Sequence, residues 1–201
     1  MNKFKGLLLL FFLTTNFQVK ADEWESPKTN FYYSENKIFM LKVVPTDIPD
    51  KYYEWRSAKQ NKKMKFTERD TTIVHCYAIL YKKVVKDSVI IWKRNLINKI
   101  CPMNASVSND GKYVVTFDNW SGMGYGVDVM VVYNELGDLI NRYKLEDISP
   151  FPINDYLMTV TSLWWNCGNK FLDIERIEIC FNVDKENKHR IFNVKEMKFE
   201  N

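Results

Sequence analysis

The residues best placed to do chemistry flank a glycine-rich loop between Asp118 and Asp128. Asp118, Asn119 and Asp128 could offer oxygen ligands, and Trp120 and Tyr125 could present an aromatic platform to a glycan or a peptide. Calcium takes about six to eight oxygen ligands, so three candidates are too few. We therefore predict no metal and no cofactor, and we expect these five residues to form a ligand-binding surface whose acids also stabilise turns.

The glycines of this loop, Gly122-Met-Gly-Tyr-Gly126, invite comparison with a phosphate-binding loop. A dinucleotide fingerprint needs a Gly-x-Gly-x-x-Gly spacing and a helix whose N-terminus faces the pyrophosphate. Here the glycines lead instead into a run of β-type residues, Val127–Tyr133. The pattern predicts a connection between two strands that needs positive φ or a close backbone approach.

Nucleophilic catalysis has little support in the residue types. The histidines are His75 and His189, and the chain contains no Gly-x-Ser-x-Gly elbow. His75 adjoins Cys76, but neighbours in a regular strand point to opposite faces, which separates the two side chains unless the strand is bulged. We predict no catalytic residue. A small envelope hydrolase that uses acids near Asp118 and Asp128 is kept as an alternative.

The cysteines are disulfide candidates because an even number can pair completely in an oxidising compartment. The chain has four, which allow three pairings: Cys76, Cys101, Cys167 and Cys180. Local proximity favours Cys76 with Cys101 and Cys167 with Cys180, although simple hairpin registers put neither pair directly opposite. No Cys-x-x-Cys spacing is present, so disulfides are favoured over a zinc site.

Residues 1–21 have the form of a secretory signal peptide. Two lysines precede an apolar run from Gly6 to Leu13, and small residues lead to an expected cut after Ala21. The run is shorter than the roughly 20 residues that cross a bilayer, so we expect no stable membrane span after cleavage. Residues 22–201 should then form a single β-rich domain in the periplasm or outside the cell. Its formal charge falls from +4 to +1, which argues against a nucleic-acid partner.

The rest of the chain is typical of strands separated by turns. β-Branched and aromatic residues recur in short runs, and no segment keeps a helical period beyond two turns. We expect a helical turn at 145–148 and consider a short helix within 53–65. Strands are expected at Lys37–Val44, Thr71–Lys83, Ser88–Lys93, Lys112–Phe117, Val127–Tyr133, Asp138–Lys144, Leu157–Trp165, Phe171–Val183 and Ile191–Lys195, the second and third forming a hairpin.

Turn signals and one aromatic pair complete this prediction. Asp110-Gly111, Asn134–Gly137 and Gly168-Asn169 predict turns, and residues 22–36 are expected to be a loop. Strand pairing should end or bulge at Pro102, which has no N–H to donate. Trp164 and Trp165 are adjacent in a predicted strand, so only one of them can face a given core.

The stretch Ser108-Asn-Asp-Gly-Lys-Tyr-Val-Val-Thr-Phe-Asp118 resembles the strand-opening signature of β-propeller blades of the TolB or WD40-like kind. With Asn119-Trp120, the glycine loop, Tyr133, Gly137 and Leu145-Glu-Asp147, it is similar to an uncharacterised family of secreted bacterial proteins, over about residues 33–165. The resemblance implies an all-β, predominantly antiparallel fold with at most short helices, arranged as a blade-like unit, a partial propeller or a sandwich. Because Ser-x-Asp-Gly occurs in one clear copy, a complete propeller is not expected.

These observations predict a secreted or periplasmic protein that binds rather than catalyses. The expected partner is another envelope protein, a peptide or a glycan, and the expected contact is the glycine loop with Trp120 and Tyr125. An inhibitor or immunity-type protein that blocks a toxin is a further alternative, because size and export permit it.

Overall fold

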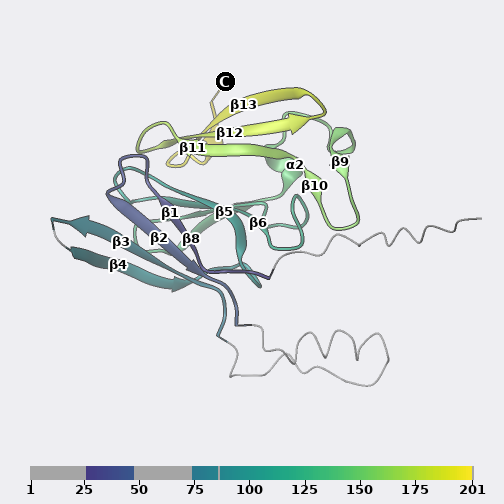
Figure 1. Cartoon of the computed structure of the whole chain (residues 1–201). Coiled ribbons are helices and arrows are strands. Elements are labelled where there is room, and N and C mark those ends of the chain that lie inside the picture. Colours follow the sequence, from purple (N-terminus) through teal and green to yellow (C-terminus); the bar gives the residue numbers. More distant parts are fainter. Residues whose placement is uncertain (1–25, 48–73, 86, 201) are drawn as a thin grey trace, which may run out of the picture.

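The computed structural model describes residues 26–47, 74–85 and 87–200, whose regular secondary structure consists mainly of antiparallel strands (Figure 1). The predicted signal peptide and the region 53–65 lie outside the described residues. Three sheets are four-stranded meanders, in which each strand pairs with the next along the chain. The all-β, predominantly antiparallel class predicted from sequence is confirmed. No described helix is long and apolar enough to cross a membrane.

The three sheets follow one another along the chain. The N-terminal sheet contains β1 (Asn30–Tyr33), β2 (Phe39–Val44), β3 (Tyr77–Val84) and β4 (Asp87–Asn95). The central sheet contains β5 (Pro102–Val107), β6 (Val114–Asn119), β7 (Met130–Tyr133) and β8 (Leu139–Tyr143). The C-terminal sheet contains β11 (Asn166–Phe171), β12 (Arg176–Val183), β13 (Glu186–Asn193) and β14 (Lys198–Phe199). Between the last two lie α2 (Leu145–Ile148), η1 (Ile153–Asp155) and a ribbon of β9 (Leu157–Met158) and β10 (Leu163–Trp164).

The central sheet is buried on both faces. Along β6 and β7, alternate side chains enter two different cores. One core lies against the N-terminal sheet and includes Leu41, Leu80, Trp92, Val114 and Tyr133. The other lies against the C-terminal sheet and includes Phe117, Val132, Trp165, Ile179 and Phe192. The near-continuous apolar sequence of β6 and β7 follows from this position between two layers.

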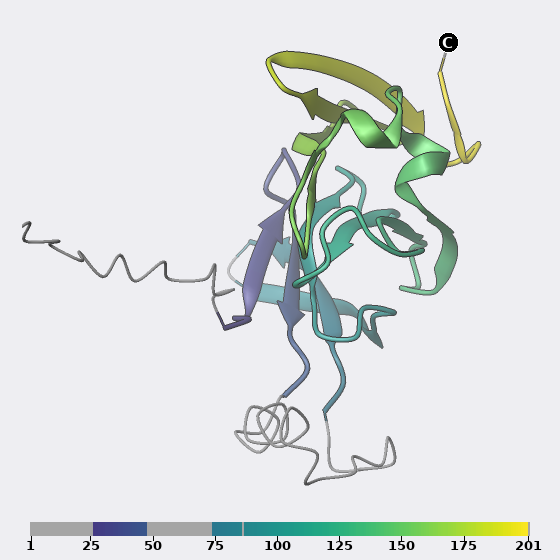
Figure 2. The same ribbon diagram turned by 90° about the vertical axis from the view of Figure 1, so that its right-hand side faces the viewer.

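The first strands of the three sheets lie close together. β1 lies beside β5, and β5 lies beside β11, so the sheets spread from a common side of the molecule (Figures 1 and 2). The described residues therefore form an open stack of three blade-like sheets and not a closed barrel.

The predicted turn at Ser108–Gly111 opens the central sheet and is confirmed. Ser108 Oγ donates to the Asp110 carboxylate at 2.8 Å, and Gly111, at φ +73°, donates its N–H to the Ser108 carbonyl at 3.0 Å. A Cβ on Gly111 would lie 2.3 Å from the Phe39 ring, so close packing of the two sheets also requires glycine here. The sequence signature thus marks both a turn and a contact between layers.

The same turn occurs a second time, at Ser34–Lys37 in the N-terminal sheet. Ser34 Oγ donates to the Asn36 side chain at 2.7 Å, and Lys37, at φ +57°, donates its N–H to the Ser34 carbonyl at 2.8 Å. The two turns are joined, because the Asn36 backbone N–H donates to the Asn109 side chain at 2.9 Å. Sequence reasoning found one copy because Asn36 and Lys37 replace the aspartate and glycine of the signature.

The other strand predictions have mixed outcomes. The β3–β4 hairpin, the strands β6 to β8 and the helical turn α2 are confirmed. The single strand expected at Leu157–Trp165 is wrong, because the chain reverses there to form the β9–β10 ribbon.

The turn expected at Gly168-Asn169 is also wrong, because both residues lie within β11. The chain turns instead after Phe171, where the Asp173 side chain accepts from two backbone N–H groups. β1 lies inside a region expected to be a loop, and β5 was not anticipated. β5 begins at Pro102, because the first residue of a strand does not have to donate an N–H to the neighbouring strand.

One of the two favoured disulfides is present. Cys167 and Cys180 are bridged with their Cα atoms 5.1 Å apart. The bridge joins β11 to β12 at a bulge, where Gly168 rather than Cys167 lies opposite Cys180. Cys76 and Cys101 are free, buried thiols, so the structure contradicts the pairing of Cys76 with Cys101.

Candidate functional site

Asp118, the central acid of the predicted site, is buried in the protein interior. Only 2% of its surface is exposed, and its backbone has a φ of +57°. Its carboxylate accepts the Gly124 N–H at 2.6 Å and the Trp165 indole N–H at 3.0 and 3.1 Å. Burial raises the pKa of this carboxyl to about 7, against the lowering effect of these hydrogen bonds. Asp118 therefore holds the glycine loop and the second core together, and its carboxylate is enclosed by these internal contacts.

The remaining predicted residues also make internal contacts. The Asn119 side chain accepts from Asn98 at 2.7 Å, and Trp120 packs against the core between the first two sheets. Asp128 forms an ion pair with Arg142 at 3.1 Å. Of the five, Tyr125 is the most exposed, at 38%, and its hydroxyl donates to the Thr159 carbonyl at 3.3 Å. The structure thus brings the five residues to one end of the central sheet without forming a shared surface.

The glycine loop fastens the β9–β10 ribbon to the central sheet. The Leu163 N–H donates to the Met123 carbonyl at 2.8 Å, and a Cβ on Gly124 would lie 2.7 Å from the Leu163 Cβ. Gly124 has a φ of +76°, so the prediction of positive φ and a close backbone approach is confirmed. The adjacent tryptophans divide as expected: Trp165 is fully buried and Trp164 is 55% exposed.

The thiols and histidines do not assemble a nucleophilic site. His75 is exposed and Cys76 is buried, as expected for neighbours on opposite faces. His189 lies on β13, with its Nδ1 3.3 Å from the Glu178 carboxylate. Burial raises the pKa of Cys76 to about 12 and that of Cys101 to about 11, which keeps both thiols protonated. Among the described residues, no group of three or more potential metal ligands gathers.

A different surface, which sequence reasoning missed, has the composition of a binding site. It is the solvent-facing side of the N-terminal sheet, called here the outer face. Strand register places its residues in rows, since residues that are directly opposite share a face. One row runs Tyr33, Met40, Tyr81 and Ile90, and the next runs Phe31, Lys42, Ile79 and Lys93.

The outer face is largely apolar and aromatic, and its residues are partly or fully exposed. Tyr33 is 58% exposed, Ile90 56% and Phe31 49%. Below the second row, Val44, Tyr77 and Asn95 extend the same surface. An exposed patch of this kind marks an interaction site more often than a scatter of single apolar residues does.

Lysines are interleaved with these rings. The Lys93 ammonium lies 4.5 Å from the centre of the Tyr77 ring, and the Lys42 ammonium lies 5.9 Å from that of Phe31. Lys83 faces the same way, opposite Ser88. No carboxylate belongs to the paired positions of this face, whereas Glu35 and Asp87 lie at its rim.

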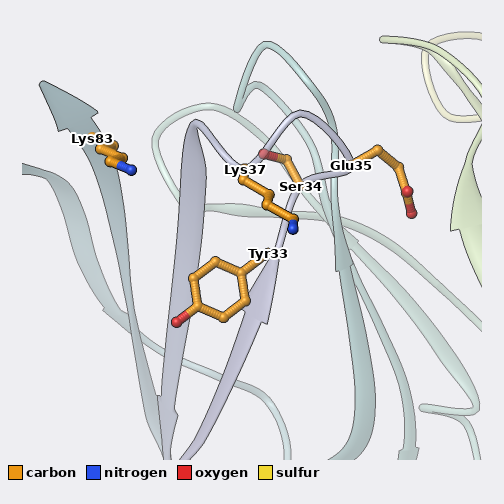
Figure 3. Close-up of a pocket in the computed structure, with 5 residues that line it drawn as sticks. All are labelled: Tyr33, Ser34, Glu35, Lys37 and Lys83. Atoms are coloured by element: carbon orange, nitrogen blue, oxygen red, sulfur yellow. The ribbon is translucent and has the colours of Figure 1, made fainter. Parts of the chain in front are cut away.

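Two shallow concavities lie at the end of the outer face near the β1–β2 turn. One, of about 510 Å³, is lined by Tyr33, Ser34, Glu35, Lys37 and Lys83. Figure 3 shows the Tyr33 ring below the side chains of Lys37 and Lys83, with Glu35 directed away from it. The other, of about 420 Å³, continues over Met40 and Tyr81 to Val84 and Asp87. The concavities combine cationic side chains with an exposed ring.

The outer face of the C-terminal sheet is different. Its Glu178 carboxylate lies 3.5 Å from the Lys170 ammonium and 3.3 Å from His189, and the Cys167–Cys180 disulfide crosses the same two strands. Asn182 donates to Asn187 at 2.6 Å on this sheet. The outer face of the C-terminal sheet thus carries paired polar side chains, while that of the N-terminal sheet exposes aromatic and aliphatic side chains.

Comparisons with known proteins add no relative. No family model, no curated protein and no solved structure matches this chain.

Proposed function

We propose that this chain is an exported, non-catalytic binding protein whose partner lies on the outer face of the N-terminal sheet. The observation that carries this proposal is the row structure of that face, in which a row of rings and aliphatic side chains lies beside a row where Phe31 and Ile79 alternate with Lys42 and Lys93. The disulfide between Cys167 and Cys180 is compatible with an oxidising compartment. The repeated four-stranded meander supports the blade-like resemblance.

A protein partner fits this face better than a glycan does. Sugars need flat rings together with several hydrogen-bonding side chains around each ring. The outer face instead supplies Met40, Val44, Ile79 and Ile90, which are shaped to pack against apolar side chains. An inhibitor or immunity-type protein would use such a surface as well.

The alternative of a hydrolase has weaker geometric support. A general acid or base must be within reach of a substrate. The Asp118 carboxylate is enclosed by Gly124 and Trp165, and Asp128 is paired with Arg142. Both acids are therefore engaged in contacts within the protein, Asp118 with the glycine loop and Trp165, and Asp128 with β8.

The proposal is tested by site-specific photo-crosslinking in the envelope of the native host. A photoreactive p-benzoylphenylalanine replaces Tyr33 on the outer face or, as the matched control, Asn187 on the polar face of the C-terminal sheet. We expect one discrete adduct from position 33, none from position 187, and loss of the adduct when Ile90→Asp is added. Equal labelling from both positions, or no adduct from position 33, contradicts the proposal.

A further inference from the structure

The stacking of the sheets indicates what kind of surface the outer face accepts. The two cores have the same construction: in each, the apolar face of one four-stranded sheet packs on the next sheet. The outer face presents a third such surface with no sheet of the described residues upon it. Its residues form rows on a pleated surface, which suits the side chains of an extended or sheet-forming segment.

The charges on this face indicate the composition of that segment. Lys42, Lys83 and Lys93 project from the paired positions, without a carboxylate among them. Their ammonium groups would lie beside any segment seated on the rings, and they need counter-charges when water is displaced. Carboxylates at alternate positions of a partner strand would supply them, and apolar side chains between the carboxylates would contact the rings.

The same charges argue against two other occupants. A second copy, packed face to face, would bring the lysines of both copies together, and like charges in an interface are unfavourable. The segment 48–73 of this chain carries seven Lys and Arg residues against four acids, so its charge is not complementary either.

From these observations, and resting on the proposed function, we infer that the partner presents an acidic, β-type segment to the outer face. Carboxylates of that segment pair with Lys42, Lys83 and Lys93, while its apolar side chains pack on Phe31, Tyr33 and Ile79. The interaction is therefore sensitive to salt, because the lysines are at the surface.

The test uses three dye-labelled peptides that alternate valine with glutamate, with glutamine or with lysine, and measures binding by fluorescence anisotropy. The glutamate peptide should bind at least tenfold more tightly than the glutamine peptide, and the lysine peptide should not bind. The triple variant Lys42→Gln, Lys83→Gln, Lys93→Gln should lose about tenfold in affinity for the glutamate peptide. Lys185→Gln, in the turn between β12 and β13, is the control and should lose nothing.

The outcomes separate this inference from the proposed function. Equal binding of the glutamate and glutamine peptides, or binding of neither, overturns the acidic partner. If the adduct from position 33 persists in that case, the outer face remains a binding surface for a partner of another composition. An adduct of twice the mass of the chain would identify a second copy as the occupant and would also overturn the inference.

Discussion

At the scale of single residues, Asp118 links three segments of the chain. It was expected to face a ligand, and it instead ties the end of β6 to the glycine loop and to Trp165. A buried carboxylate with positive φ is costly, and it persists because Gly124 and Trp165 place three N–H contacts around it. Because burial disfavours the charged form, it raises the pKa of the Asp118 carboxyl to about 7.

This pKa predicts how stability depends on pH. The carboxyl has an ordinary value of 3.8 and a folded value of about 7, so the folded state binds a proton more tightly than the unfolded state. The stability that protonation contributes is complete below pH 3.8 and is lost as the pH rises to about 7. The loss is on the order of 4 kcal/mol, since one pKa unit is about 1.4 kcal/mol.

The unmodified protein should lose stability between pH 4 and pH 7. The Asp118→Asn variant should keep the fold and show no such loss, because asparagine does not titrate. The measurement is the free energy of unfolding in urea at several pH values, with intrinsic tryptophan fluorescence as the probe. Asp110→Asn is the matched control, because asparagine holds the equivalent position in the Ser34–Lys37 turn. Identical pH profiles for Asp118→Asn and the unmodified protein would contradict the assignment.

The cysteines provide a second prediction for individual residues. Cys76 and Cys101 are buried thiols whose raised pKa disfavours the reactive thiolate. Iodoacetamide should label neither in the folded protein, two cysteines after denaturation and four after denaturation with reduction, as counted by mass spectrometry. Absence of labelling in the denatured, unreduced protein would show that Cys76 and Cys101 are bridged after all.

At the scale of elements, the repeated turn explains how two sheets are joined. Ser34–Lys37 and Ser108–Gly111 use the same serine and Asx contacts, and Asn36 binds Asn109 between them. They differ at the last position, where a lysine in one and a glycine in the other adopt positive φ. Only glycine adopts this conformation without a steric penalty.

Substitutions at Lys37 and Gly111 are expected to change the free energy of unfolding in opposite directions. Lys37→Gly should stabilise the protein by up to about 1 kcal/mol, because it relieves the left-handed strain. Gly111→Ala should destabilise it by about 2 kcal/mol, because a Cβ would collide with the Phe39 ring as well as strain the backbone. Urea denaturation measures both, and changes of the same sign would show that the two turns are not equivalent.

Elements were predictable where the signal was local. The β3–β4 hairpin and β6 carry continuous runs of β-type residues, and α2 ends before Pro150. β1 and β5 were missed because each is short and is defined by its pairing with the next strand, and β5 is in addition polar at Asn104 and Ser106. The break between β9 and β10 follows from hydrogen bonds between Thr159 and Ser162, which a strand-like composition does not reveal.

At the scale of the whole molecule, the two ends of the sheet stack differ in chemistry. The polar pairs around Glu178 close the C-terminal end, and the rings and lysines around Lys42 leave the N-terminal end open to a partner. The sequence predicted the binding site at the glycine loop, whereas the structure favours the outer face. The two differ because burial depends on which sheets pack together. Trp120 and Phe31 both lie outside the strands predicted from sequence, yet the first packs against a core and the second is exposed.

The all-β class, several strands, the Ser108–Gly111 turn and the positive φ within the glycine loop were predictable from the sequence. These follow from alternation and backbone sterics, which act within a few residues. The tertiary structure decided that Asp118 is an internal link, that Cys167 pairs with Cys180 while Cys76 and Cys101 do not pair, and which face of β1–β4 meets solvent. Each of these depends on contacts between distant segments, and a strand with apolar residues on both faces does not specify which face will be covered.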